Sequence, residues 1–362
     1  MRIRIVIISF FMLTLHFYDI GNNEGENETT PVIGILTMPI AKIYPDYFSI
    51  INTSYISWIK QTGLRWMPIN VFGSEEYIKK RLGEVNGVLL PGSHSVDISN
   101  TNNDNLSKKM LNNNKHYKKA FKLILNHAIK ENDEGNVFVV FGTCFGLQAL
   151  LRLTFDFKGK MDILEDMNKN MPIYFTDNAN KSVNLSLVLN ENDLKRFNGV
   201  KIAAANHFGF SLDTFNSSER LKEEFTILAT AFNQNNIEHV ALVEHKDYPF
   251  IACQFHLEKS QFVHLTELNI NRSDLSTEFG IKMAFMIREL LRHEKNEINN
   301  KYINTTKSRF FYTVLGKTEE TLVLPSTSYQ NYMKDTNTNM MFSSKEIKHA
   351  VGVESSYRSF FY

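Results

Sequence analysis

A cysteine placed between two glycines is the strongest candidate for a reactive group in this sequence. The segment Val137–Leu151 reads VFVVFGTCFGLQALL, an apolar strand pattern that passes through Gly142, Cys144 and Gly146 into a helix pattern. A nucleophile elbow has this form, because small neighbours let the strand and the helix approach while the nucleophile lies on a sharp turn. The start of a helix also favours the thiolate. We therefore predict that Cys144 is a nucleophile; the alternative is a buried cysteine in a glycine-containing turn.

A histidine and a glutamate two positions apart follow another apolar run. Tyr248–Lys259 reads YPFIACQFHLEK and places His256 and Glu258 at the end of a predicted strand. Residues i and i+2 of an extended chain point to the same face, so the carboxylate would orient the imidazole and stabilise its protonated form. We expect His256 to act as general base and Glu258 as its orienting partner. The alternative is a pair of exposed polar residues at a strand end.

A third turn supplies backbone amides. Gly87–Ser93 reads GVLLPGS, a buried strand that ends in Pro-Gly. An amide near Gly92 or Ser93, together with the amide of Phe145, would form an oxyanion hole. An ordinary turn at the end of a strand is the alternative. All three segments lie at predicted strand ends, where open parallel sheets place their sites.

The remaining composition excludes several classes of function. The net charge is +1, with 40 basic and 39 acidic residues, so no basic surface for nucleic acid is expected. Cys253 lies in an apolar run and is interpreted as a small buried side chain. Cys253-x-x-His256 is only half of a zinc site and no second ligand pair stands out, so we expect neither a metal nor an organic cofactor.

Short apolar runs alternate with longer periodic segments, which predicts an α/β fold. The expected architecture is a mainly parallel sheet sandwiched by helices, with a denser and partly antiparallel region later in the chain. The expected strands are 32–36, 65–69, 87–90, 137–141, 201–205, 225–232, 238–244 and 250–255, and the expected helices are 50–61, 74–84, 115–131 and 277–297. Ser99–Asn114 is rich in asparagine and is expected to be an exposed loop.

The N-terminus has the pattern of a signal peptide. Arg2 and Arg4 precede the apolar run Ile5–Phe17, which is too short to span a bilayer, so residues 1–21 are predicted to be removed during secretion. An uncleaved anchor is the alternative. Sequons such as those at Asn180 and Asn216 agree with a glycoprotein that is secreted or sent to a lysosome or vacuole. No other segment predicts membrane insertion.

The order of these segments along the chain, oxyanion turn, cysteine and then His-x-Glu, resembles that of the class I glutamine amidotransferases. Within that fold, the chain resembles the gamma-glutamyl hydrolase family over residues 31–298. The resemblance is carried by the segments Pro31–Leu36, Tyr55–Ile69, Val85–Gly92, Gly142–Gln148, Asn206–Leu212 and Tyr248–Lys259.

The resemblance implies that Cys144, His256 and Glu258 form a catalytic triad and that His207 positions substrate or handles a proton. It implies a flavodoxin-like fold and hydrolysis of gamma-glutamyl peptides, typically folylpolyglutamates, through a thioester. The sequence departs from the family at Ser93, where the family has glycine, and at Leu257, where it has proline. The role of residues 299–362, a C-terminal extension, stays open.

Two other functions stay open at this point. One is hydrolysis of another gamma-glutamyl amide, and the other is a catalytically inactive binding homologue. The sequence also leaves open whether the chain acts alone or as a homodimer.

Overall fold

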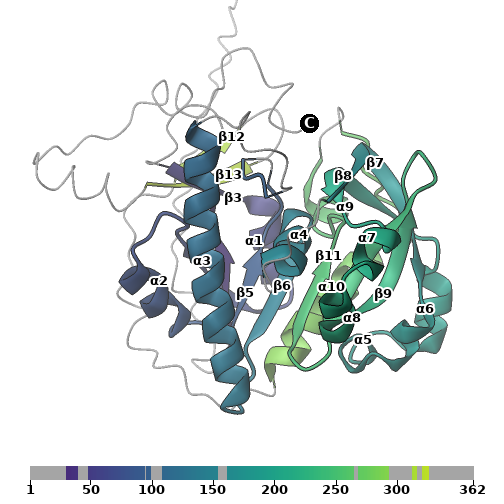
Figure 1. Ribbon diagram of the computed structural model, residues 1–362, viewed down its shortest axis with the longest axis horizontal. Coiled ribbons are helices and arrows are strands. Elements are labelled where there is room, and N and C mark those ends of the chain that lie inside the picture. The colour runs from purple at the N-terminus through teal and green to yellow at the C-terminus, as the bar shows by residue number, and fades with distance from the viewer. Residues whose placement is uncertain are drawn as a thin grey trace, which may run out of the picture.

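The core of the protein is a mixed nine-stranded sheet in the order β4-β1-β5-β6-β11-β10-β9-β7-β8. The computed structural model describes residues 30–39, 48–93, 95–98, 108–153, 161–264, 268–292, 312–315 and 320–325. The predicted signal peptide, residues 1–21, lies outside these residues. Figure 1 shows the central sheet with helices packed around it.

Five neighbouring strands of the sheet are parallel: β4 (Arg65–Ile69), β1 (Val32–Leu36), β5 (Gly87–Leu90), β6 (Val139–Thr143) and β11 (Phe250–Cys253). Their apolar runs are continuous, as expected for strands that are covered on both faces. The predicted bounds of β1, β4 and β5 are confirmed. The carboxyl ends of these strands meet at one edge of the sheet, which is where the candidate residues lie.

The other four strands are antiparallel: β10 (Glu238–His245), β9 (Phe225–Phe232), β7 (Asp162–Phe175) and β8 (Lys201–Gly209). The α/β fold class is confirmed, but a large part of the sheet is antiparallel. The sequence did not predict β7, because this strand is polar and its pairing with β8 shifts register twice. Glu165 and Asn168 adopt positive φ within it.

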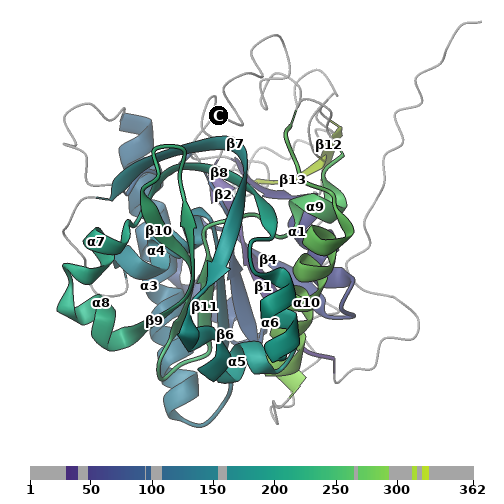
Figure 2. The ribbon, with the colours of Figure 1, turned by 90° about the vertical axis from the view of Figure 1, so that its right-hand side faces the viewer.

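Helices cover both faces of the sheet (Figure 2). On one face lie α2 (Glu75–Leu82), α3 (Lys108–Asp133) and α4 (Phe145–Leu153), and on the other lie α1 (Thr53–Lys60) and α10 (Asp274–Arg292). Each face has its own apolar core, one containing Tyr117 and Phe121 and the other Trp58 and Phe279. The shorter helices are α5 (Val183–Ser186), α6 (Glu191–Phe197), α7 (Leu212–Asn216), α8 (Glu219–Glu224), α9 (Lys259–Phe262) and the 3-10 helix η2 (Asp177–Lys181).

The expected exposed loop at Ser99–Asn114 is partly wrong. Residues 99–107 lie outside the described ranges, but α3 already begins at Lys108. Asn113 and Asn114 are buried, and their side chains bind the backbone of the preceding segment at Ser95 and Asp97. These asparagines therefore hold the 95–98 segment against α3, a tertiary role that the local composition does not reveal.

The C-terminal extension contributes to a second, four-stranded sheet, β12-β13-β3-β2. Its strands β12 (Tyr312–Leu315) and β13 (Glu320–Pro325) form an antiparallel pair. β13 then pairs with β3 (Phe48–Asn52), which also pairs with β2 (Met38–Pro39). The sequence predicted a helix from Ile50, but residues 50–52 belong to β3 and α1 begins at Thr53.

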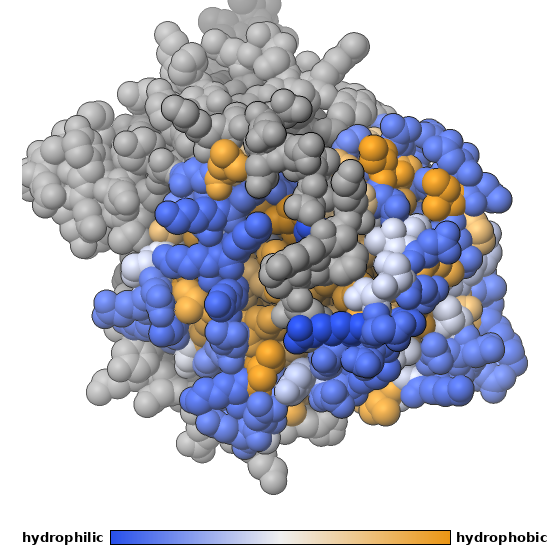
Figure 3. Space-filling model, in the orientation of Figure 1, coloured by the Kyte–Doolittle hydropathy of each residue, from blue (hydrophilic) through white to orange (hydrophobic). Residues whose placement is uncertain are grey.

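The surface of the described residues is mainly hydrophilic on the face shown in Figure 3, with apolar residues lying singly or in small groups. Scattered apolar side chains are normal on protein surfaces. Among the described residues, no helix combines the length and the apolar character needed to cross a membrane.

Close packing around Gly146 leads to a testable prediction. A Cβ at Gly146 would lie 2.2 Å from the carbonyl oxygen of Leu90, and one at Gly142 would lie 2.7 Å from the backbone of Gly146. We expect Gly146→Ala to lower the free energy of unfolding by about 2 kcal/mol, because strand and helix must separate. Urea unfolding measures this change.

Gly83→Ala is a matched control for this substitution. Its Cβ would meet only ordinary contacts of 3.6 Å or more, at an αR position. The free energy of unfolding should then change by less than about 0.5 kcal/mol. Equal stability of the two variants would contradict the packing argument.

Candidate active site

Cys144 occupies a sharp turn between β6 and α4. Its φ is +55°, a left-handed conformation that is uncommon for a residue other than glycine. The amides of Leu147 and Gln148 bind the carbonyl oxygen of Cys144, so the first turn of α4 begins directly at this residue. Strain of this kind often occurs at functional sites, and the elbow predicted from the sequence is present.

The pairing of β6 with β11 brings the second candidate segment beside the elbow. Cys253 lies opposite Thr143 in the parallel ladder, and the amide of Cys144 donates to the carbonyl oxygen of Cys253 at 2.7 Å. The side chain of Cys253 is fully buried and its thiol faces the carbonyl oxygen of Phe255 at 3.3 Å. Cys253 is therefore a buried structural residue, as predicted.

His256 and Glu258 form a buried pair. His256 Nδ1 lies 2.7 Å from Glu258 Oε1, so this nitrogen carries the ring proton and donates a hydrogen bond to the carboxylate. The contact does not arise from an extended strand, as the sequence pattern suggested. β11 ends at Cys253, and residues 254–258 turn into α9. The His256 backbone amide is held by the carbonyl oxygen of Ala203 in β8 at 2.8 Å.

Burial controls the charges in the site. Burial lowers the pKa of His256, and the neighbouring Lys259 lowers it further, in opposition to Glu258. Burial has the largest single effect on Glu258 and disfavours its ionised form, but His256, Lys259 and a backbone hydrogen bond together hold the pKa of Glu258 below its usual range. The pair therefore consists of a neutral imidazole beside a carboxylate.

Burial also acts on the thiol of Cys144. It raises the pKa of Cys144 to about 12, although Lys259 and the backbone amide of Phe145 both lower it. The amide at the start of α4 does favour the thiolate, as expected, but desolvation has the larger effect and the thiol stays protonated. His256 Nε2 has no hydrogen-bond partner among the described residues. Cys144 and His256 are thus both neutral here.

The predicted oxyanion turn lies beside Cys144 and His256. A Cβ at Gly92 would lie 2.9 Å from His256 Cε1 and 3.2 Å from Cys144 Cβ, so only glycine fits this position without displacing the pair. The Gly92 amide donates to the hydroxyl oxygen of Tyr55 at 3.0 Å. Neither Gly92 nor Ser93 has a positive φ, so serine at position 93 imposes no strain. The Ser93 side chain binds Ser95 instead.

Sequence reasoning missed two side chains of the site. The Tyr55 hydroxyl of α1 lies 3.3 Å from His256 Nδ1, and the Asn206 Oδ1 of β8 lies 3.3 Å from Cys144 Sγ. His207, which was expected near the active site, is exposed and packs against Phe208. Neighbouring residues of a strand face opposite sides, so the buried Asn206 reaches the sulfur while the side chain of His207 does not.

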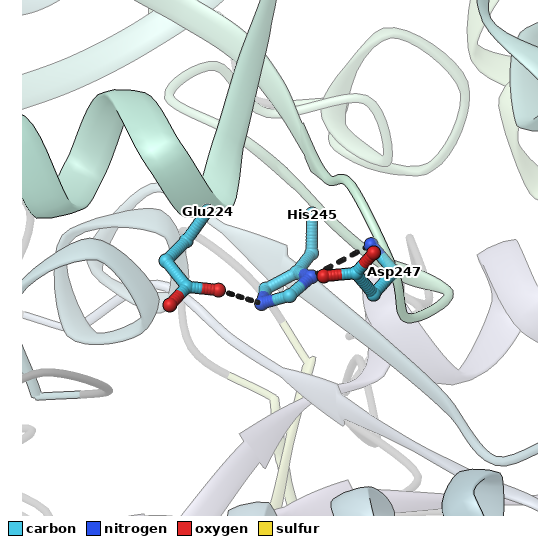
Figure 4. A group of neighbouring side chains, drawn as sticks. All are labelled: Glu224, His245 and Asp247. Carbon is cyan, nitrogen blue, oxygen red and sulfur yellow. Dashed lines mark hydrogen bonds and ion pairs between the residues drawn. The ribbon is translucent and has the colours of Figure 1, made fainter.

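Figure 4 shows the described group that comes nearest to a metal-ligand set, Glu224, His245 and Asp247. The backbone amides of Asp247 and Tyr248 donate to His245 Nδ1 at 3.1 and 3.3 Å, while Nε2 faces Glu224 at 3.3 Å. Burial lowers the pKa of His245 to about 4. Both ring nitrogens are engaged and the two carboxylates lie on opposite sides of the ring, an arrangement that suits a structural clamp better than a metal site.

Comparison with known proteins assigns the chain to a family. The family model described as Peptidase C26 matches residues 31–258. Gamma-glutamyl hydrolase B of Dictyostelium discoideum is 28% identical over 94% of this chain and 96% of that protein. Gamma-glutamyl hydrolase of Homo sapiens is 25% identical over 78% of this chain and 83% of its own length. Gamma-glutamyl hydrolase 1 of Arabidopsis thaliana is 26% identical over 64% of each.

A solved structure of a putative GMP synthase subunit from Thermoplasma acidophilum is also similar, with a TM-score of 0.39 and 13% identity over 73% of this chain and 98% of that one. The family model covers more than half of the chain, and the nucleophile elbow lies within the matched residues. The protein is thus a member of the Peptidase C26 family.

Proposed function

We propose that the protein hydrolyses gamma-glutamyl peptide bonds with Cys144 as nucleophile, His256 as general acid and base, and Glu258 as its orienting carboxylate. The observation that carries the chemistry is a buried His256–Glu258 pair, 2.7 Å apart, at the sheet edge where Cys144 occupies a strained elbow. The names of the Dictyostelium, human and Arabidopsis relatives support the gamma-glutamyl bond as the target.

The proposed reaction begins with transfer of the Cys144 proton to His256 Nε2, the ring nitrogen that has no partner among the described residues. The sulfur then attacks the amide carbonyl, and the oxyanion forms near the amides of Phe145 and Gly92. His256 gives its proton to the leaving amine as the C–N bond breaks and a thioester remains. His256 then takes a proton from water, which attacks the thioester and releases the gamma-carboxylate and the thiol.

Tyr55 contributes to the proposed reaction because its hydroxyl contacts both Gly92 of the oxyanion turn and His256, the proposed base. The hydroxyl oxygen accepts a hydrogen bond from the Gly92 amide and lies near His256 Nδ1. A forming oxyanion would compete with the hydroxyl for the Gly92 amide. Tyr55 therefore holds the amide in the site until charge develops on the substrate.

Folylpolyglutamates are the proposed substrates, in keeping with the resemblance of the sequence segments to gamma-glutamyl hydrolases. Another gamma-glutamyl amide is the alternative substrate. An inactive binding protein is the alternative from a different class, and the proximity of His256 to Glu258 together with the elbow at Cys144 argues against it. The proposed route is secretory, supported by Arg2, Arg4 and the apolar run Ile5–Phe17.

The nucleophile is tested by Cys144→Ala and Cys144→Ser. Both variants should lose turnover of a polyglutamyl folate, because neither offers a thiol, while their unfolding midpoints stay close to that of the wild type. Chromatography of the folate products gives the rate and the bond that is cut. Cys253→Ala is the matched control and should remain active. Substantial hydrolysis by Cys144→Ala would refute the mechanism.

The roles of His256 and Glu258 are separated by a double-mutant cycle. His256→Ala removes both acid and base and should slow the single-turnover rate about 10²–10⁴-fold. Glu258→Gln keeps the shape of the side chain and should lose only part of the rate. The double variant should be little slower than His256→Ala, because the residues act as one unit. Fully additive losses would mean that Glu258 acts elsewhere.

The proposed route is tested on protein from its natural source. N-terminal sequencing should find a mature chain that begins shortly after residue 17, because the apolar run would be removed with the signal peptide. Treatment with an N-glycosidase should lower the apparent mass if sequons such as Asn216, which is exposed, carry glycan. A species that retains Met1 in the cytosol would exclude this route.

A further inference from the structure

The thiol of Cys144 faces an amide instead of its expected base. Cys144 Sγ lies 3.3 Å from Asn206 Oδ1, and the carbonyl oxygen of Ala205 is next at 4.0 Å. His256 Nε2, the atom that must take the thiol proton, has no partner among the residues that the structure describes. The hydrogen-bond contacts of the thiol are therefore with β8, and it makes none with the imidazole.

The side chain of Gln254 sets the orientation of the Asn206 amide. Gln254 Nε2 donates to Asn206 Oδ1 at 2.9 Å, and both side chains are buried, with 1% and 0% of their surface exposed. The backbone amide of Gln254 is fixed in turn by the carbonyl oxygen of Ala241 in β10. Asn206 Nδ2 and Gln254 Oε1 have no partner among the described residues, so the contact with Gln254 Nε2 alone presents the oxygen of Asn206 to the sulfur.

An acceptor beside a thiol stabilises the protonated form. A hydrogen bond to the neutral form of a group disfavours its ionisation, and the thiolate is the form that attacks. The contact with Asn206 therefore opposes catalysis as long as it lasts. For the proton to reach His256, the sulfur must turn away from Asn206.

We propose that Asn206 is a positioning residue that keeps Cys144 in a protonated resting position, from which the sulfur turns to His256 for reaction. The proposal rests on the function proposed above, because it assumes that Cys144 is the nucleophile. It assigns Gln254 the task of presenting the oxygen of Asn206 to the thiol. The resting site is then uncharged at Cys144 and His256, as burial of both groups favours.

Several other titratable or charged groups face this position. His256, Glu258 and Lys259 come from the segment after β11, and Tyr55 comes from α1. Asp166 of β7 lies opposite Asn206 in the ladder and is 2% exposed, and burial raises its pKa to about 6. Since the variants below leave all five groups in place, a changed thiol pKa would report on Asn206.

The test measures how fast iodoacetamide alkylates Cys144, by mass spectrometry of its peptide, over a mildly alkaline pH range. Below the thiol pKa this rate is proportional to the thiolate fraction. Asn206→Leu removes the acceptor and should raise the rate about fivefold at a given pH. Asn206→Asp adds a charged acceptor of the same shape and should lower it about tenfold or more.

Asn178→Asp controls for an added charge, because Asn178 is exposed on η2, and its rate should equal that of the wild type. Gln254→Met keeps Asn206 but removes the donor that fixes its oxygen, so the amide can turn its nitrogen to the sulfur and the rate should rise. If substitutions at Asn206 prevent folding, the alkylation rate of Gln254→Met tests the proposal instead.

An unchanged or lower rate in Asn206→Leu, or in Gln254→Met if Asn206→Leu does not fold, would overturn the proposal. The alkylation assay needs no substrate, so its outcome is independent of the proposed reaction. Expected shifts in alkylation together with absent folate hydrolysis by the wild type would reject the proposed substrate and leave the role of Asn206 intact. Active enzyme without the shifts would reject only the role of Asn206.

Discussion

The arrangement of the site depends on the parallel pairing of β6 with β11. This ladder sets Cys253 opposite Thr143, and its last bond joins the Cys144 amide to the Cys253 carbonyl oxygen. The elbow therefore starts from the same backbone position at which the segment carrying His256 leaves the sheet. A slip of one residue would turn every side chain of the strand to the other face, so both apolar cores enforce the register. The geometry of the proposed catalytic site is thereby tied to two strands whose residues are all buried.

β8 completes the site from the antiparallel half of the sheet. Its Ala203 carbonyl oxygen holds the His256 amide, and its Asn206 meets the sulfur. The same strand therefore contacts the proposed base through its backbone and the proposed nucleophile through a side chain. The parallel half supplies the proposed reacting groups, and the antiparallel half sets how they face one another.

The sequence was sufficient to predict the elements that have a local sequence pattern. The elbow around Cys144 and the strands β1, β4 and β5 follow from apolar runs and glycine spacing within about 15 residues. Tyr55 and Asn206 could not be found in this way, because their contacts join parts of the chain that are far apart in sequence. His207 was expected near the site from the family resemblance, but the structure exposes His207 and buries Asn206; strand alternation identifies two faces but not which one is buried. The sequence did not predict β7 because bulges interrupt the alternation of apolar and polar residues along this strand.

The hairpin of β12 and β13 means that a strand early in the chain is completed by one that is synthesised much later. β3 precedes α1 and its Tyr55, yet one of its two neighbours, β13, comes from near the other end of the chain. Contacts between such distant segments are slow to form, and during synthesis this pairing must wait until the ribosome has released β13. β3, the strand that leads into α1 and Tyr55, therefore gains its second neighbour only after all the proposed catalytic residues have been synthesised. A nascent chain that ended before this hairpin would contain every proposed catalytic residue but would lack one strand of the sheet that leads into α1.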